Sequence, residues 1–128
     1  MRLYFAIGGA LVKKNIVAEN SFRFAVRITK LHKYLQKEKA EYILSRQLLR
    51  AGTSICANIM EAQRAQSRAD FLSKMSIALK EANETQYWLR LLYNAEYLPA
   101  AGFRSMHRDL KELLSLLTAI CKKVKSEM

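Results

Sequence analysis

Apolar side chains recur every three or four residues through most of this chain, and this spacing is the feature that most constrains its fold. The pattern is present in four segments, over about residues 15–38, 44–62, 67–98 and 110–125. A row with this spacing lies along one face of an α-helix, so each segment is predicted to be an amphipathic helix. No segment shows the two-residue alternation of a β-strand. The chain is therefore predicted to be all-α.

Local signals mark the ends and the packing of these helices. Ser67 followed by Asp70 can cap the first free backbone N–H groups of the third helix. Pro99 predicts that this helix ends at Leu98, and Gly102 is expected to relax the turn that follows. Gly52 lies inside the second helix, where it costs about 1 kcal/mol relative to alanine, so it predicts the close approach of a neighbouring helix.

The length of the chain limits it to one domain. With 128 residues it can build a single core. Helices of about 24 residues span about 36 Å, and short connections predict an antiparallel, up-down four-helix bundle over residues 15–128. Residues 1–14 are assigned to an N-terminal extension, and we expect that translation begins near Val12. The apolar run Leu3–Val12 is shorter than the roughly 20 residues that a membrane helix needs, so no membrane partner is expected.

Positive charge is concentrated at one end of the sequence. The 22 Lys and Arg residues exceed the 11 Asp and Glu residues, which gives a formal net charge of +11. Between Lys13 and Ala40 the only acids are Glu19 and Glu38, whereas residues 67–98 are balanced. Such a chain attracts polyanions, and net charge alone does not choose among nucleic acid, an acidic protein surface and an anionic membrane.

Cations of the first predicted helix follow helical spacing opposite its apolar row, with Tyr34 among them. They are Arg23, Arg27, Lys30, Lys33 and Lys37. A solvated helix face is one interpretation, but cations without interleaved acids repel each other unless a counter-charge arrives, so we predict phosphate binding. No base-reading motif is recognisable. Secondary candidates, which alternatively pair with Glu61, Glu81 or Glu84, are Arg46, Arg50, Arg64 and Arg68.

No recognisable catalytic or metal-binding motif is present. His32 and His107 are isolated in the sequence and are interpreted as surface histidines. Glu81 and Glu84 lie one turn apart and are expected to bridge to arginines of a neighbouring helix or subunit rather than to perform acid–base chemistry. The two cysteines, Cys56 and Cys121, are expected to be reduced core thiols of a cytoplasmic protein. We therefore expect no enzymatic activity, no cofactor and no metal.

The third predicted helix carries more apolar surface than an isolated bundle needs. Outside its core row lie Ile77, Tyr87, Trp88 and Leu91. Large apolar side chains on a monomer's surface are unusual, so they predict self-association, with a wide core inside one bundle as the alternative. Candidates for the subunit interface or for pairing between helices are Glu61, Glu81, Glu84 and Trp88.

The middle of the chain resembles a known family. The stretch Ser45–Ile55, followed by Ala57-Asn58-Ile59 and Glu61-Ala62, is similar to the signature of the bacterial four-helix-bundle protein family. That family includes proteins encoded in intervening sequences of large-subunit ribosomal RNA genes and the accessory variability protein of diversity-generating retroelements. The resemblance continues through residues 66–71, 77–82 and 84–89 and covers about Lys14–Lys125, although Cys56 stands where members more often carry glycine.

The resemblance implies a fold, an assembly and a function. It implies an antiparallel four-helix bundle assembled as a homopentameric barrel, a basic surface proposed to bind nucleic acid, and no established catalytic activity. We therefore expect a basic oligomer that holds structured RNA or RNA–DNA hybrids through phosphate contacts. The alternatives are an adaptor that docks onto a larger partner such as a reverse transcriptase, as in the retroelement branch, and a membrane-surface bundle anchored by Leu3–Val12.

Overall fold

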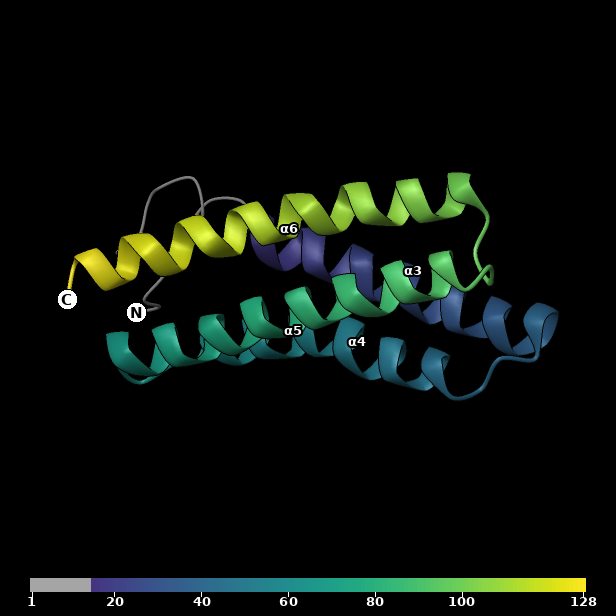
Figure 1. Ribbon diagram of the computed structural model, residues 1–128. Helices are drawn as coiled ribbons and strands as arrows, with labels where there is room; N and C mark the ends of the chain where they lie inside the picture. Colours follow the sequence, from purple (N-terminus) through teal and green to yellow (C-terminus); the bar gives the residue numbers. More distant parts are fainter. Residues whose placement is uncertain (1–14) are drawn as a thin grey trace.

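The computed structural model describes residues 15–128, and within this range the chain folds into a bundle of four helices without strands. The helices are α3 (Ile16–Lys39), α4 (Leu44–Ala62), α5 (Arg68–Asn94) and α6 (Ala100–Ser126). Consecutive helices run in opposite directions, and their connections alternate between the two ends of the bundle (Figure 1). The predicted all-α, up-down four-helix bundle is confirmed. The predicted N-terminal extension, residues 1–14, lies outside the described residues.

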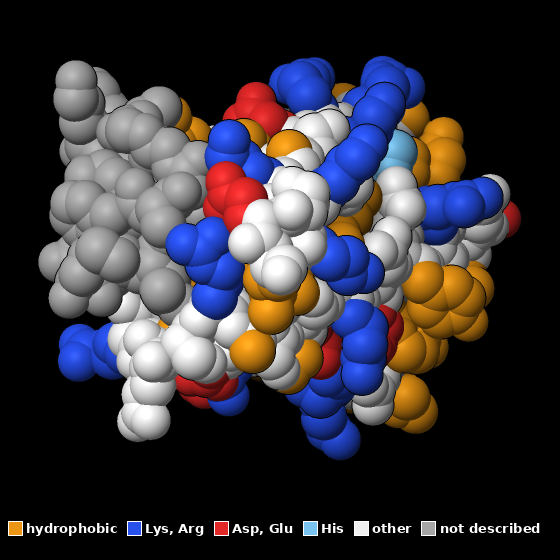
Figure 2. Space-filling view, turned by 90° about the vertical axis from the view of Figure 1, so that its left-hand side faces the viewer, with side chains coloured by type: hydrophobic (Ala, Val, Ile, Leu, Met, Phe, Trp, Pro, Cys, Tyr) orange, Lys and Arg blue, Asp and Glu red, His pale blue; other side chains and the backbone are white. Residues whose placement is uncertain are grey.

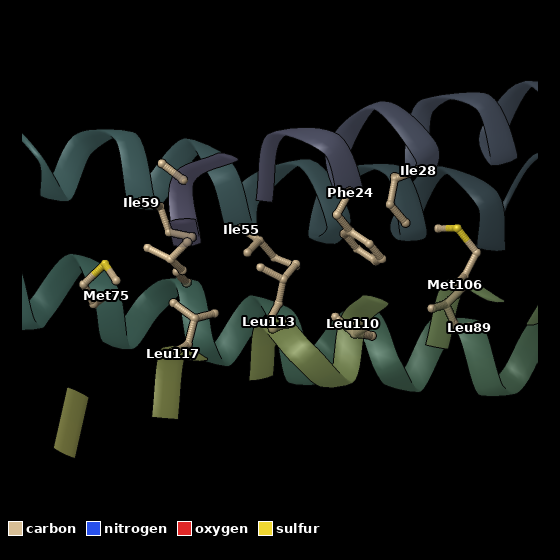
Figure 3. Close-up of a cluster of buried hydrophobic side chains, with 14 of the residues drawn as sticks. Phe24, Ile28, Ile55, Ile59, Met75, Leu89, Met106, Leu110, Leu113 and Leu117 are labelled. Carbon is tan, nitrogen blue, oxygen red and sulfur yellow. The ribbon is translucent and has the colours of Figure 1, made fainter. Parts of the chain in front are cut away.

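The predicted apolar rows form the core between the four helices (Figure 3). Side chains from every helix are fully buried there, among them Phe24 of α3, Ile55 of α4, Leu89 of α5 and Leu113 of α6. Burial of such side chains is worth about 1.5–3 kcal/mol each, which makes this core the main source of stability. The rows predicted for α3 and α6 also include residues that lie half-buried at the edge of the core, such as Leu31.

Gly52 provides the close helix approach that the sequence predicts. A Cβ atom built on Gly52 of α4 would lie 2.7 Å from Cγ1 and 2.8 Å from Cγ2 of Ile28 on α3. Ile28 is itself fully buried, so it has no open space into which to move. The absence of a side chain at residue 52 thus lets α3 and α4 pack in direct contact.

Two helix starts use side-chain caps, of which one was predicted. Ser67 Oγ accepts the backbone N–H of Asp70 at 3.0 Å, as expected. The start of α4 is capped by Glu41, whose carboxylate accepts the N–H groups of Leu44 at 3.0 Å and Ser45 at 2.6 Å. Burial alone would raise the pKa of Glu41, but these backbone donors outweigh it and hold the pKa below its usual value. The cap places the charged form of Glu41 at the positive end of the helix dipole.

The connection between α5 and α6 differs from the prediction. Helix α5 ends at Asn94, four residues before Leu98, because Glu96 adopts a left-handed conformation with φ 70°. The N–H of Glu96 donates to the carbonyl of Tyr93, and the N–H of Tyr97 donates to that of Leu92, which closes the helix in a Schellman motif. Pro99 then stands at the start of α6, and Gly102 lies within its first turn rather than in a loop.

His107 is more enclosed than a surface histidine. Its ring stacks on Phe103 with centroids 5.2 Å apart, and Phe103 stacks in turn on Tyr93 at 4.4 Å. Its Nε2 atom lies 2.9 Å from the side-chain nitrogen of Gln86 on α5. The residue therefore belongs to an aromatic stack between α5 and α6, which the sequence interpretation missed. Both cysteines have free thiols, with Cys56 buried and Cys121 half-buried.

Candidate nucleic-acid interface

The candidate cations of α3 lie around the part of the helix that is not buried. Phe24, Ile28 and Leu35 are buried in the core, whereas the lysines among the candidates occupy exposed positions of the same helix. Lys30, Lys33 and Lys37 are exposed, and their spacing of three and four residues puts them on one side of α3. They form no ion pair with any residue between 15 and 128. We call these three residues the lysine row.

Arg27, one turn before the lysine row, is held by α6. Its guanidinium lies 2.5 Å from the Asp109 carboxylate and donates to Ser105 Oγ at 2.7 Å. The Arg27 and Asp109 side chains are 38% and 46% exposed, so the ion pair is worth about 0–1 kcal/mol. The counter-charge that the sequence interpretation sought in an external polyanion is thus supplied here by a neighbouring helix.

Arg23 also lies beside acidic groups of α6. Its guanidinium donates to Asn20 Oδ1, and the Asn20 amide donates to Glu112 at 3.2 Å. Together with Asp109 these residues line a small hollow of about 70 Å³. The predicted set of five cations is therefore divided. Its first two members contact polar or acidic groups, while the lysine row remains open to an external anion.

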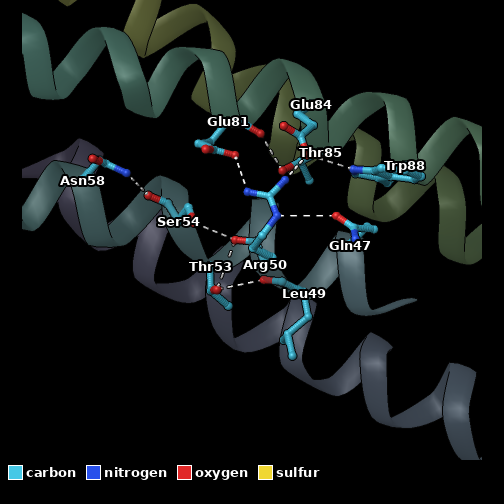
Figure 4. Close-up of polar contacts among 10 residues, drawn as sticks. All are labelled: Gln47, Leu49, Arg50, Thr53, Ser54, Asn58, Glu81, Glu84, Thr85 and Trp88. Atoms are coloured by element: carbon cyan, nitrogen blue, oxygen red, sulfur yellow. Dashed lines mark hydrogen bonds and ion pairs between the residues drawn. The ribbon is translucent and has the colours of Figure 1, made fainter. Parts of the chain in front are cut away.

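The Arg50 side chain of α4 reaches between Glu81 and Glu84 of α5 (Figure 4). It donates to Glu81 Oε1 at 3.4 Å and also to Glu84, which accepts the indole N–H of Trp88 at 3.1 Å. The structure thus places Arg50 in contacts between helices of one chain. Two carboxylates beside one guanidinium give this cluster a net negative charge, so it does not attract phosphate.

The remaining candidates lie apart from this cluster. Arg68 pairs with Glu127 at 3.0 Å, and Glu61 pairs with Lys74 at 3.2 Å. Arg46 and Arg64 are exposed, and no ion pair joins them to the rest of residues 15–128. The secondary candidates therefore divide into paired arginines on α4 and α5 and isolated surface arginines.

A further row of cations on α6 was not singled out from the sequence. Arg104, Arg108 and Lys111 are exposed and follow the same spacing of four and three residues. Applying the helical-spacing rule to residues 99–128 as well as to the first helix would have found them. At the end of the bundle near the C-terminus, Lys and Arg side chains lie in several groups, and Asp or Glu side chains adjoin some of them (Figure 2). The excess positive charge is thus spread beyond α3.

The described residues offer no metal site and no membrane span. Between residues 15 and 128, no three His, Cys, Asp or Glu side chains gather in a way that could hold a metal ion. None of the helices in the same range has an apolar stretch that would cross a bilayer.

Comparison with known proteins places this architecture in a family. Residues 13–119 match the family model described as 23S rRNA-intervening sequence protein. The chain belongs to this family. One solved structure that matches is the crystal structure of a protein with unknown function from the S23 ribosomal protein family of Bacteroides thetaiotaomicron, with a TM-score of 0.83 and 53% sequence identity. The match covers 84% of this chain and 96% of that chain. No curated protein matches the chain.

The family match confirms the resemblance noted in the sequence. The 23S rRNA-intervening sequence protein family matches over α3, α4, α5 and most of α6, so the candidate cations predicted from the sequence lie within the matched residues. The lysine row and the cations Arg104, Arg108 and Lys111 of α6 therefore lie within the matched residues.

Proposed function

We propose that this chain is a non-enzymatic, cytoplasmic, oligomeric helical bundle that binds RNA through phosphate contacts. The observation that carries the proposal is the lysine row of Lys30, Lys33 and Lys37, which is exposed on one side of α3 and has no ion pair with residues 15–128. A phosphate backbone supplies the counter-charge that this row lacks, and each neutralised phosphate releases condensed counterions into solution.

The chemistry of the lysine row determines the kind of contact that it can make with a nucleic acid. Lysines on a helix surface make point-charge contacts that position a backbone and carry no base specificity. The ligand class that we propose is structured RNA or an RNA–DNA hybrid, and it rests on these phosphate contacts together with the family resemblance, which implies a basic surface that binds nucleic acid. Assembly into the homopentamer implied by the family resemblance would repeat the row and raise the apparent affinity without new contacts.

The test is the salt dependence of binding. We expect the logarithm of the affinity for duplex RNA to fall linearly with the logarithm of salt concentration. The double variant K33E/K37E should weaken binding and reduce the slope by about one for each lost phosphate contact. Fluorescence anisotropy with a labelled RNA duplex measures the affinity and its salt slope. The salt concentration is varied from about 50 to about 200 mM.

A control variant with the same change in net charge shows whether binding depends on the lysine row or on the overall positive charge of the protein. Lys122 and Lys123 are exposed near the C-terminal end of α6, and K122E/K123E changes the net charge as K33E/K37E does. This control should alter the slope less. Equal losses in the two variants would contradict the assignment to α3, and an affinity that does not respond to salt would contradict phosphate binding altogether.

An adaptor function is the second candidate, because α3 and α4 expose apolar side chains between them. Phe22 and Met60 are 57% and 47% exposed, and both line a hollow of about 360 Å³. Such a surface fits a protein partner, and a reverse transcriptase is the partner that the retroelement branch suggests. An adaptor would bring RNA only in the presence of its partner, so a gel shift by the purified protein alone favours the first proposal.

A further inference from the structure

A hollow of about 460 Å³ lies between α3 and α6, near the connection from α5 to α6. From α3 it is lined by Arg27, Lys30, Leu31 and Tyr34, and the rest of its wall includes Leu98 and Met106. Leu98 and Met106 are buried, while Leu31 and Tyr34 are half-buried against the core. The wall of the hollow is therefore apolar and aromatic, and two cations belong to its lining.

The charge of the lining distinguishes this hollow from its neighbour. The neighbouring hollow, of about 590 Å³, shares Tyr34, Leu98 and Pro99 but is lined by Lys39 together with Glu96. The first hollow is lined by Arg27 and Lys30 and by no acidic residue, and because Arg27 is paired with Asp109, Lys30 supplies its free positive charge. An anionic group attached to a flat apolar body is therefore attracted to the first hollow, while Glu96 opposes it in the second.

Arg27 and Lys30 differ in how free they are to bind an anionic ligand. Arg27 is fixed by Asp109 at 2.5 Å and by Ser105 Oγ at 2.7 Å, so its position is set before anything binds. Lys30 is exposed and belongs to the lysine row, where it has no ion pair with residues 15–128. Lys30 precedes Tyr34 by four residues and therefore lies on the same side of α3. An anion at Lys30 would lie next to the aromatic wall.

We propose that this hollow receives one unpaired nucleotide of RNA, with its base against Tyr34 and its phosphate at Lys30. The inference rests on the proposed function and adds a preference for loops and bulges over continuous duplex. An unpaired base can leave its own stack and place its flat face on an aromatic side chain, whereas a paired base has both faces covered. Stacking of this kind tolerates any base, so it adds affinity without requiring a sequence-reading motif.

The first experiment uses the unmodified protein and an RNA hairpin with one 2-aminopurine in its loop. Stacking of this fluorescent base on Tyr34 should change its emission when protein is added, and the same base placed in the paired stem should show no such change. Replacing the loop nucleotide by an abasic one should weaken binding by about 5-fold or more, as expected for loss of one stacked base. Unchanged loop emission together with unchanged affinity for the abasic hairpin would overturn the inference.

The second experiment tests the role of Tyr34. The variant Y34L keeps an apolar side chain and should weaken binding of the hairpin by about 5- to 100-fold, which corresponds to one stacking contact. Y34F should bind as the unmodified protein does, because it retains the ring. Y42L is the matched control, since Tyr42 is 51% exposed in the connection between α3 and α4. It should leave hairpin binding unchanged.

Binding to a continuous duplex separates the two proposals. Y34L should bind the duplex as the unmodified protein does, so an equal loss for hairpin and duplex would overturn the base site. Duplex binding that is sensitive to salt but shows no preference for the hairpin would leave the proposed function standing and refute this inference. Failure to bind either RNA would refute both. If Y34L does not fold, the 2-aminopurine and abasic results with the unmodified protein decide the question.

Discussion

At the scale of single residues, Gly52 shows how tightly the bundle is packed. The position where its Cβ would lie is 2.7–2.9 Å from Ile28 side-chain atoms, and Ile28 is fully buried. Alanine is the better helix former by about 1 kcal/mol, so helix propensity alone favours replacing this glycine. Packing opposes the replacement, because real Cβ atoms do not approach other side chains this closely.

We expect Gly52→Ala to lower the free energy of unfolding by about 1–3 kcal/mol, the usual cost of overpacking a core. Denaturant titration followed by circular dichroism measures the change. Removing the obstructing atoms with Ile28→Ala should make the two substitutions non-additive, so that G52A costs less in the I28A background than in the native protein. A G52A variant that is more stable than the native protein would show that α4 can move away from α3.

Residue types also limited what the sequence could predict. Ser67 and Gly52 were interpreted correctly because Ser67 acts through a hydroxyl that reaches a backbone N–H three residues later, and Gly52 acts through the lack of a side chain. Glu41 was missed because glutamate is not a preferred cap residue and its longer side chain reaches forward to the N–H groups of Leu44 and Ser45, three and four residues later. Glu96 was missed because left-handed glutamate is uncommon, and its conformation depends on the hydrogen bonds that close α5.

At the scale of helices, the sequence predicted each element and two of the contacts between them, the close approach at Gly52 and the bridge from Glu81 and Glu84 to an arginine, but it missed the contacts between α3 and α6. The apolar spacing identified four helices because a buried face repeats within one element. The Arg27–Asp109 pair joins residues that are 82 positions apart, and no local pattern connects them. For this reason the first helix was interpreted as an uninterrupted row of cations. The structure instead leaves Lys30, Lys33 and Lys37 as its open part.

The junction of α5 and α6 should respond to pH through His107. Burial, followed by the charges of Lys111 and Arg90, lowers the pKa of His107 below its usual value of 6.5. The folded protein therefore favours the neutral ring. As pH falls below about 6.5, the unfolded chain binds a proton that the folded chain resists, so stability is complete above that pH and is lost as the pH falls toward the lowered pKa.

We expect the melting temperature to fall as the pH is lowered from about 7.5 to about 5.5. This range extends about one unit to each side of the ordinary histidine pKa. His107→Gln should reduce this dependence, because glutamine does not titrate. Calorimetry of both proteins at several pH values measures the difference, and comparison of slopes removes the constant cost of losing the stack on Phe103. His32→Gln is the matched control. If the melting temperature of the His107 variant depends on pH as strongly as that of the native protein, protonation of His107 is not the cause of the dependence.

At the scale of the whole molecule, sequence and structure agree on the bundle, and self-association remains a prediction. The excess apolar side chains foreseen on α5 divide into two groups. Trp88 packs partly against the core and donates to Glu84, and Leu91 is half-buried, whereas Ile77 and Tyr87 are 37% and 56% exposed. Ile77 and Tyr87 lie ten residues apart, within one row of alternating three- and four-residue steps, and so share the outer side of α5.

This outer side of α5 should be an interface between copies of the chain. Tyr87 also lines a hollow of about 420 Å³ with Gln86 and Arg90, which gives the surface a shape that a second copy can fill. We expect sedimentation equilibrium at micromolar concentration to give a mass several times that of one chain. Tyr87→Lys should shift the protein toward monomer without lowering the stability of the bundle, because the side chain is mostly outside the core.

Phe22→Lys provides the control, since Phe22 is 57% exposed on α3 and the change in charge is the same. It should leave the assembly intact if the interface is on α5, and it should be the disruptive variant if the copies meet through α3 and α4. The assembly also links this prediction to RNA binding. Because repeated lysine rows act together, the Tyr87 variant should lose RNA affinity together with its oligomeric state, although no residue of the row has changed. A native protein that remains monomeric would remove both the interface and this coupling.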